Sequence, residues 1–224
     1  MLDLFLYGVF PYVALALALV GGLWRYFRDR FSFSAFSSQL LENRSLFWGS
    51  VPWHYGIVIL LVGHLIGWLI PAGVAAFNAV PLRLYILEIT ALGLGLLALV
   101  GIAILLYRRA VNPRVRAAGT AMDVVLVVLL LAQAALGVYT AVFVRWGSWW
   151  YISNAVPYLN SLLVLNPQIQ YATSLPLLTQ LHVLNAFLLV AVFPFSRLIH
   201  VFTYPITYLW RPYINVIWYR RSRN

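Results

Sequence analysis

The sequence predicts an all-α membrane protein, a bundle of five transmembrane helices. Two observations carry this prediction: 63% of the 224 residues are hydrophobic and only 9% are charged, and the apolar residues are gathered in long stretches. A soluble domain is about 45–50% apolar and about 25% charged, so this chain has too little polar surface to face water. We therefore expect a single transmembrane domain over residues 1–224 that crosses the cytoplasmic (inner) cell membrane several times.

Five stretches are long enough to cross a bilayer. The hydrocarbon core is about 30 Å thick and a helix rises about 1.5 Å per residue, so one crossing needs about 20 apolar residues. These stretches do not alternate polar with apolar residues, which excludes a transmembrane β-barrel and leaves helices. In chain order the predicted spans are 4–24, 51–70, 84–107, 124–144 and 177–203.

Each span has its own start or stop signal. The first lacks a preceding positive charge and is too long for a signal peptide, so we expect it to be retained. Pro71 ends the second, and the third contains a single charge, Glu88. Asp123 stands before the fourth, where a carboxylate favours the helix dipole. Pro194 lies inside the fifth and is expected to bend it.

The arginines set the predicted orientation. The chain has fifteen basic residues, all arginine, against five acidic ones. They lie between apolar stretches and not on one soluble face, so they indicate topology and not nucleic-acid binding. Cytoplasmic segments carry the excess of positive charge. We therefore expect the N-terminus outside and the C-terminus in the cytoplasm, with residues 204–224 as a cytoplasmic tail rich in arginine and aromatic residues. Thirteen arginines fall on the cytoplasmic side, and only Arg83 and Arg145 fall outside.

The stretch 146–176 has no charged residue but too many polar ones for a sixth span. We expect an outer loop at the headgroup level, either with one helix lying flat or only partly ordered. The chain also contains no cysteine, so it can hold no iron–sulfur cluster and no thiolate metal site. Chemistry of that kind has to come from a partner.

All four histidines lie in two of the predicted spans, His54 and His64 in the second and His182 and His200 in the fifth. Ionisable groups inside a bilayer usually face the bundle interior as ligands, relays or pairing groups. Because the two spans run in opposite directions, His54 is expected near the cytoplasmic face with His200, and His64 near the outer face with His182. The spacing between His182 and His200 is five helical turns, which puts them on one face of a straight helix.

Two imidazoles at each of two depths suit haem. A closed zinc site normally needs four protein ligands, whereas a porphyrin fills four positions of its iron and leaves two for histidines. Such an iron passes electrons and does not activate oxygen. Histidines that bond between helices, or relay protons in a small transporter, remain the alternative. Gly56, Gly63 and Gly67 would leave room for a flat macrocycle, although the last two also match a helix-packing G-x-x-x-G pair.

Several segments resemble the gamma subunit of the membrane-bound respiratory nitrate reductase. They are His54-Tyr-Gly-Ile-Val-Ile-Leu-Leu-Val-Gly-His64, Asn112-Pro-Arg-Val-Arg-Ala117, Phe193-Pro-Phe-Ser-Arg-Leu-Ile-His200 and Ser37-Ser-Gln-Leu40. The resemblance covers nearly the whole chain, and the Phe-Pro-Phe-Ser-Arg-x-x-His element is its most specific part. It implies a membrane cytochrome with two haem b groups and five spans, in which His64 and His182 ligate the outer haem, and His54 and His200 ligate the inner one.

The same resemblance implies the reaction and the partners. A quinol, menaquinol or ubiquinol, would be oxidised near the outer haem, and the electrons would pass through both haems to an iron–sulfur beta subunit and then to a molybdenum-containing alpha subunit that reduces nitrate. The alternative is a dihaem anchor of another quinone-linked oxidoreductase, acting on formate, hydrogen or sulfur compounds.

Three further residues are candidates for binding roles. The family's quinol pocket includes a lysine near the start of the third span; this sequence has no lysine, and Arg83 is the basic residue of that region. We expect Gly63, His64 and Arg83 at the quinol site. Arg197, within one turn of His200, is the arginine we favour for a haem propionate, although the default interpretation of the inner arginines is that they only fix topology and contact anionic membrane lipid. Glu88 is either a proton acceptor near quinol or only a charge at a helix end.

Overall fold

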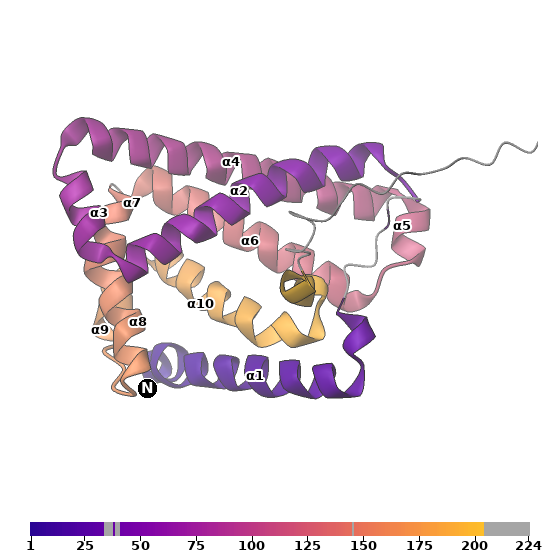
Figure 1. The fold of residues 1–224 in the computed structure, drawn as a ribbon, viewed down its shortest axis with the longest axis horizontal. Coiled ribbons are helices and arrows are strands. Elements are labelled where there is room, and N and C mark those ends of the chain that lie inside the picture. Colours follow the sequence, from indigo (N-terminus) through magenta and orange to yellow (C-terminus); the bar gives the residue numbers. More distant parts are fainter. Residues whose placement is uncertain (34–37, 39–40, 145, 204–224) are drawn as a thin grey trace, which may run out of the picture.

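The computed structural model describes residues 1–33, 38, 41–144 and 146–203, and the tail predicted at 204–224 lies outside them. Within these residues every regular element is a helix and there is no strand (Figure 1). Five of the described helices are long and apolar enough to cross a membrane: Leu4–Arg28, Arg44–Leu69, Pro81–Val111, Ala121–Phe143 and Leu177–Phe195. The predicted class, a five-helix multi-pass membrane protein, is confirmed, while the orientation of the two termini stays a prediction.

The long helices are joined by shorter helical segments. The first span begins with a π-helical turn, η1 (Leu4–Val9), that runs into α1. The other main helices are α2, α4, α6 and α10. The bounds are α1 Phe10–Arg28, α2 Arg44–Leu69, α4 Pro81–Val111, α6 Ala121–Phe143 and α10 Leu177–Val192. The short segments are η2 Arg30–Ser32, α3 Pro71–Asn78, α5 Pro113–Ala117, α7 Gly147–Trp150, η3 Tyr151–Ala155, α8 Val156–Leu163, α9 Gln170–Thr173, η4 Phe193–Phe195 and η5 Arg197–Thr203.

The long helices pack in series: α2 against α4, α4 against α6, α6 against α10, and α10 against α1. Glycines bring α2 and α4 together backbone to backbone. A Cβ on Gly101 would lie 2.5 Å from the backbone nitrogen of Trp53, and one on Gly56 would lie 2.7 Å from the backbone oxygen of Leu94. Gly56 therefore makes room for α4 and not for a macrocycle. Similarly, a Cβ on Gly67 would lie 2.8 Å from Cε1 of Tyr151.

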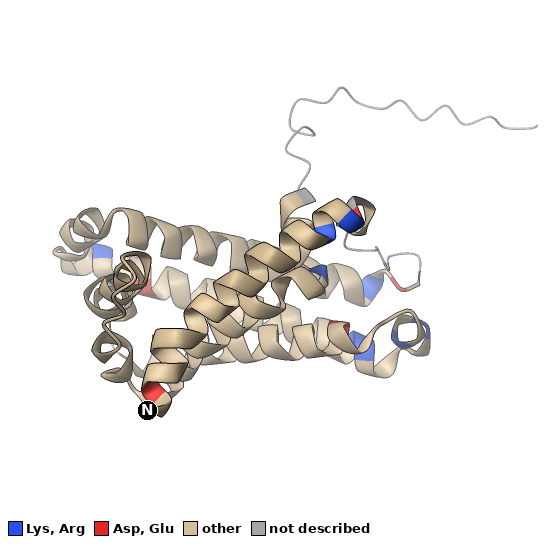
Figure 2. Ribbon diagram, turned by 90° about the horizontal axis from the view of Figure 1, so that it is seen from below, with Lys and Arg blue, Asp and Glu red and all other residues tan. Residues whose placement is uncertain are grey.

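The segment expected as an outer loop is mostly helical. Its helices α7, η3, α8 and α9, residues 147–173, are called the cap here; they lie with α3 across one end of the bundle (Figure 1). The arginines gather mainly at the opposite end (Figure 2), the distribution on which the predicted orientation depends. Buried Tyr158 ties the cap to the first span, since its hydroxyl donates to the Tyr7 carbonyl at 2.7 Å.

The fifth predicted span, 177–203, is not one continuous helix. Helix α10 ends at Val192, and the chain continues as two 3-10 segments, η4 and η5. Pro194 has no N–H, and its ring opposes the carbonyl four residues earlier, so it breaks the hydrogen-bond ladder. Arg25 of α1 compensates, because its Nη1 donates to the Pro194 carbonyl at 2.7 Å and to the Ser196 carbonyl at 3.0 Å. The position of His200 is therefore set by η5 and not by five turns of a straight helix.

Candidate functional site

The structure brings His54 and His200 together at the arginine-rich end. Their ring centroids are 6.3 Å apart and the ring planes meet at 71°. The Nδ1 atom of His54 lies 2.7 Å from the Ser50 carbonyl oxygen, and that of His200 lies 2.6 Å from the Arg197 carbonyl oxygen. Because a carbonyl only accepts, each Nδ1 donates, which makes Nε2 the ring nitrogen with a lone pair for a metal.

The separation of these two rings fits one metal ion between them. A metal–imidazole bond is about 2.0–2.1 Å long, and a ring centre lies about 1 Å behind its nitrogen, so two imidazoles on opposite sides of one ion have centres about 6 Å apart. The 6.3 Å between the two ring centres agrees with this value, which is one condition for two imidazoles to share an ion. The donor set also fits, since neutral imidazole with a hydrogen-bonded Nδ1 is the usual haem ligand.

His64 and His182 are the second predicted pair. The Nδ1 of His64 donates to the Leu60 carbonyl at 2.7 Å, as in the first pair. Among the described residues, the buried Nδ1 of His182 has no hydrogen-bond partner, and its Nε2 lies 3.4 Å from Nε2 of Gln133. An unsatisfied buried nitrogen costs free energy, so this ring environment suits a group that is bound from outside the chain.

The exposure of His54 and His64 also suggests that a bound group covers them. His54 and His64 are exposed on the surface of α2, within a helix long and apolar enough to span a membrane. A polar ring left against hydrocarbon is unfavourable unless something covers it. In the part of the chain that the structure describes, no three histidine or carboxylate side chains converge to hold a metal by themselves. A haem needs only two, because its porphyrin supplies the other four ligands.

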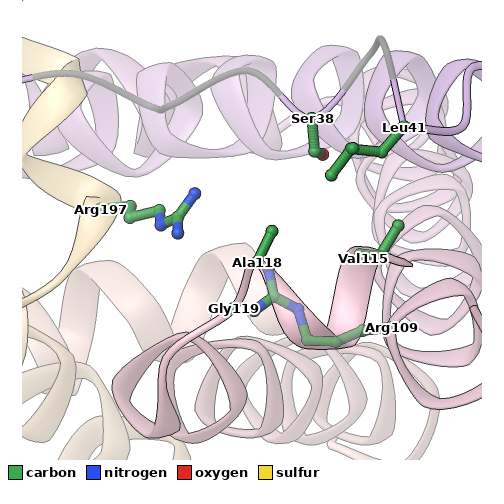
Figure 3. A pocket seen from close by; sticks show the side chains of 7 residues that line it. All are labelled: Ser38, Leu41, Arg109, Val115, Ala118, Gly119 and Arg197. Carbon is green, nitrogen blue, oxygen red and sulfur yellow. The ribbon is translucent and has the colours of Figure 1, made fainter. Parts of the chain in front are cut away.

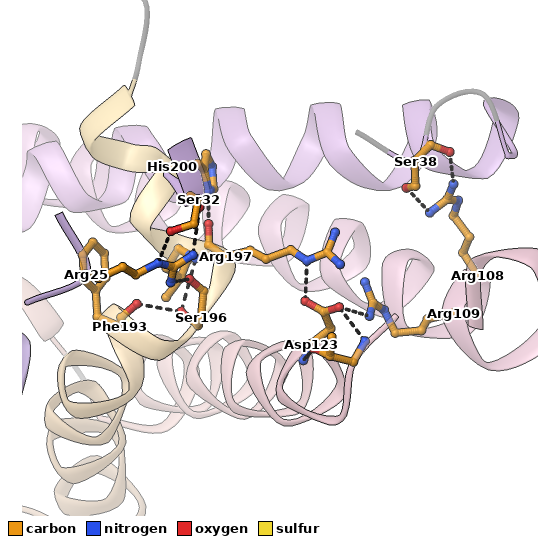
Figure 4. Close-up of polar contacts among 12 residues, drawn as sticks. Arg25, Ser32, Ser38, Arg108, Arg109, Asp123, Phe193, Ser196, Arg197 and His200 are labelled. Atoms are coloured by element: carbon orange, nitrogen blue, oxygen red, sulfur yellow. Dashed lines mark hydrogen bonds and ion pairs between the residues drawn. The ribbon is translucent and has the colours of Figure 1, made fainter. Parts of the chain in front are cut away.

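A buried carboxylate organises the charges beside the first pair. Asp123 at the start of α6 accepts from Arg197 Nε at 2.6 Å through Oδ1 and lies 3.2 Å from Arg109 Nη1 through Oδ2 (Figure 4). It also completes a capping box with Thr120. Asp123 thus joins α4, α6 and η5. The role expected for Arg197 at a haem propionate stays a prediction.

A second ion pair joins the segment before α2 to α4. Arg108 Nε donates to Glu42 Oε2 at 2.6 Å, and the Ser45 backbone N–H donates to Glu42 Oε1 at 2.7 Å. The hydrogen bond from Ser45, followed by that from Arg108, holds the pKa of Glu42 below its ordinary value of 4.5. This carboxylate is therefore ionised over the whole neutral range.

A cavity of about 390 Å³ opens between these charges (Figure 3). Two arginines line it, and both are already paired with Asp123. The lining residues are Ser38, Leu41, Arg109, Val115, Ala118, Gly119 and Arg197.

The residues expected at the quinol site lie at the cap end. A Cβ on Gly63, next to His64, would meet nothing within 4 Å, so the helix surface is open at this position. Arg83, in the first turn of α4, places its guanidinium 5.8 Å from the centre of the Phe77 ring. Glu88 holds the cap, since its Oε1 accepts from Ser148 N at 2.9 Å and from Ser148 Oγ at 2.6 Å. The roles of these residues toward quinol stay predictions.

Two contacts of the histidines were not expected from the sequence. Gln133 beside His182 comes from a different helix, and the Tyr151 hydroxyl donates to the His64 carbonyl at 2.9 Å. Burial raises the pKa of Tyr151 to about 12, so its hydroxyl keeps the proton that it donates. The sequence analysis places this segment at the headgroup level and links no residue of it to His64.

Fold and site together define a multi-pass helical membrane protein in which two of the membrane helices carry the histidines and His54 and His200 lie side by side. The chain belongs to the nitrate reductase gamma subunit family, which it matches over residues 3–219. It is thus the gamma-type membrane subunit of a nitrate reductase complex, a component of an oxidoreductase.

Individual relatives agree with the family. The chain is 34% identical to the nitrate reductase gamma chain of Bacillus subtilis (strain 168), over 97% of this chain and 98% of that protein. It is 32% identical to the respiratory nitrate reductase 1 gamma chain of Escherichia coli (strain K12), over 95% of this chain and 96% of that one. It is also 36% identical to the nitrate reductase-like protein NarX of Mycobacterium tuberculosis (strain ATCC 25618 / H37Rv), over 92% of this chain but 32% of that protein.

Proposed function

We propose that this chain is a dihaem b-type cytochrome that oxidises quinol near the outer face of the membrane and delivers the electrons to the cytoplasmic side of a respiratory nitrate reductase. The observation that carries the proposal is the His54–His200 pair, 6.3 Å between ring centres with both Nδ1 atoms bonded to carbonyls. The family membership supports nitrate as the final acceptor.

The four histidines would hold the two haems, His54 with His200 and His64 with His182. When bound, the haems would supply one-electron carriers at two depths, in line with the two one-electron steps by which a quinol becomes a quinone. Backbone carbonyls fix three of the four imidazoles in the tautomer that such binding requires. Hydrogen bonds from Nδ1 to a carbonyl orient the ring and raise its basicity as a ligand.

Quinol, as menaquinol or ubiquinol, would bind beside His64, where Gly63 leaves space. Arg83, in the first turn of α4 and so also at the cap end, would orient a quinol oxygen by donating a hydrogen bond to it. Oxidation of one quinol releases two protons and two electrons, and the protons would leave on the outer side. Charge would therefore cross the membrane without a proton pump.

The partners follow from what the chain lacks. It has no cysteine, so the iron–sulfur relay belongs to a beta subunit that would dock at the arginine-rich end, and nitrate would be reduced on a molybdenum-containing alpha subunit. Arginines that remain outside this interface would meet anionic lipid.

The test is the haem content of the complex purified from membranes. We expect two bis-histidine b haems per chain. His64→Ala or His182→Ala should lose one haem together with quinol oxidation. His54→Ala or His200→Ala should lose the other haem and leave an outer haem that quinol still reduces. Leu19→Ala, at an exposed position on the histidine-free helix α1, is the control and should keep both haems. A colourless wild-type protein would overturn the proposal.

A further inference from the structure

The cap reaches one histidine directly, through Tyr151 at its η3 segment. The Tyr151 hydroxyl donates to the His64 carbonyl at 2.9 Å, and the two rings meet edge to face with centroids 5.1 Å apart and planes at 86°. A carbonyl oxygen has two lone pairs, so it accepts this bond in addition to one from its own helix. His64 is therefore held at its backbone and at its ring by a segment that lies 87 positions away in the sequence.

The space for this contact is built into α2. Gly67 lies one turn after His64, and a Cβ there would lie 2.8 Å from Cε1 and 3.1 Å from Cδ1 of Tyr151. Only a glycine leaves room for this edge of the phenol ring against the helix. The Tyr151 contact thus depends on a second residue whose main effect is to leave room.

Polar contacts of Ser148 with α3 and α4 fix the turn that leads to Tyr151. Asn78 Nδ2 donates to Ser148 Oγ at 2.9 Å, and Ser148 donates from both N and Oγ to Glu88 Oε1. These bonds tie α7 to α3 and α4 just before Tyr151. The chain enters α7 through Trp146, which has a left-handed φ of 56° that bulky residues rarely adopt. Such strain persists where the surroundings fix the backbone, as the Trp146–Tyr85 ring contact at 5.1 Å does here.

We propose that Tyr151 is a positioning residue for His64, and that Glu88 acts through it by anchoring the cap. This inference rests on the proposed haem-binding role of His64. The Leu60 carbonyl holds one edge of the imidazole through Nδ1. Tyr151 fixes the backbone that carries the ring and limits its rotation about the Cβ–ring bond. The orientation of an axial imidazole is one of the means by which a protein tunes its haem iron. The cap would thereby set the redox properties of the outer haem without binding it.

The first experiment compares two tyrosine variants of the purified complex. Tyr151→Phe keeps the ring and removes only the hydroxyl. Tyr158→Phe is the matched control, because Tyr158 also lies in the cap and also donates to a helix carbonyl, that of Tyr7. Its ring packs against Phe187 of α10. We expect Tyr151→Phe to shift the midpoint potential and the low-spin paramagnetic resonance signal of the outer haem and to leave the inner haem unchanged. Tyr158→Phe should change neither signal.

The second experiment tests the route from Glu88. Glu88→Ala should produce the same shift as Tyr151→Phe, and the double variant should shift no further, since both changes act on one contact. Additive shifts would show that Glu88 acts on the site by another path and would overturn its part of the inference. Ser148→Ala serves if Glu88→Ala does not fold. Gly67→Ala should also move the outer signal, whereas Gly93→Ala, whose Cβ would meet nothing within 4 Å, should not.

The outcomes separate the two proposals. A wild-type complex without two haems overturns the proposed function and this inference with it. Two haems with an outer signal that Tyr151→Phe leaves unchanged, or that Tyr158→Phe shifts equally, overturn only the positioning role.

Discussion

The carboxylate of Asp123 accepts a hydrogen bond from Arg197 Nε at 2.6 Å, which joins the start of α6 to η5 (Figure 4). The carbonyl of the same arginine accepts from Nδ1 of His200 at 2.6 Å. The two bonds form a short path from a buried side chain on one helix to a candidate ligand on another segment. Stability and ligand geometry at this end should therefore change together.

Asp123→Ala should lower the free energy of unfolding by about 3 kcal/mol, because it leaves two arginines without their shared carboxylate and also removes a helix cap. Asp123→Asn keeps a capping oxygen and should cost less. Denaturant unfolding in detergent measures both changes. Asp29→Asn, at an exposed carboxylate near the same end, is the control. A loss for Asp29→Asn as large as that for Asp123→Ala would contradict the bridging role.

Arg25→Lys should destabilise the end of α10 by about 2 kcal/mol, although it preserves the charge. A lysine has no planar fork with which to reach the carbonyls of Pro194 and Ser196 together with Ser32. Hydrogen exchange of residues 193–203 should rise in this variant. Arg28→Lys, at an exposed arginine in the same turn, should leave exchange unchanged. Equal protection in both variants would show that Arg25 does not support the helix break.

Gly101→Ala should cost about 1–3 kcal/mol, since the new methyl group would lie against the backbone of α2 and force the helices apart. Gly93→Ala on the same helix meets nothing within 4 Å and should be neutral or slightly stabilising. Thermal unfolding of the two variants side by side tests the close approach. The idea fails if both glycines tolerate alanine equally.

The Glu42–Arg108 pair should make stability depend on pH in the acid range. The folded state holds the pKa of Glu42 below 4.5, so the contribution of this carboxylate is complete above about pH 5. It is lost as the pH falls below 4.5 and passes through the folded-state pKa. The difference in melting temperature between wild type and Glu42→Gln should therefore be constant near neutrality and shrink below pH 4.5. A difference that grows on acidification would reverse the assigned sign.

The sequence was sufficient for those features that depend on local pattern. Length and hydropathy identified five spans, and opposed helix directions placed His54 beside His200, which the structure also brings together. The end of α10 at Val192 could be predicted only in part. Pro194 indicates a break in the helix, but no local pattern indicates that Arg25 of another helix stabilises that break. No local pattern links Tyr151 to His64, since their contact depends on how the cap folds across the bundle.

If electrons follow the proposed path, the ten-residue interval between His54 and His64 on α2 makes their transfer depend on the membrane voltage. Those residues lie in one helix and rise about 15 Å, roughly half of the hydrocarbon thickness. An electron that moves between the two levels would cross about half of the membrane voltage, which is worth about 1 kcal/mol for each 100 mV. An energised membrane, negative inside, would oppose this inward transfer, so turnover should slow as the voltage rises and recover when an ionophore collapses it.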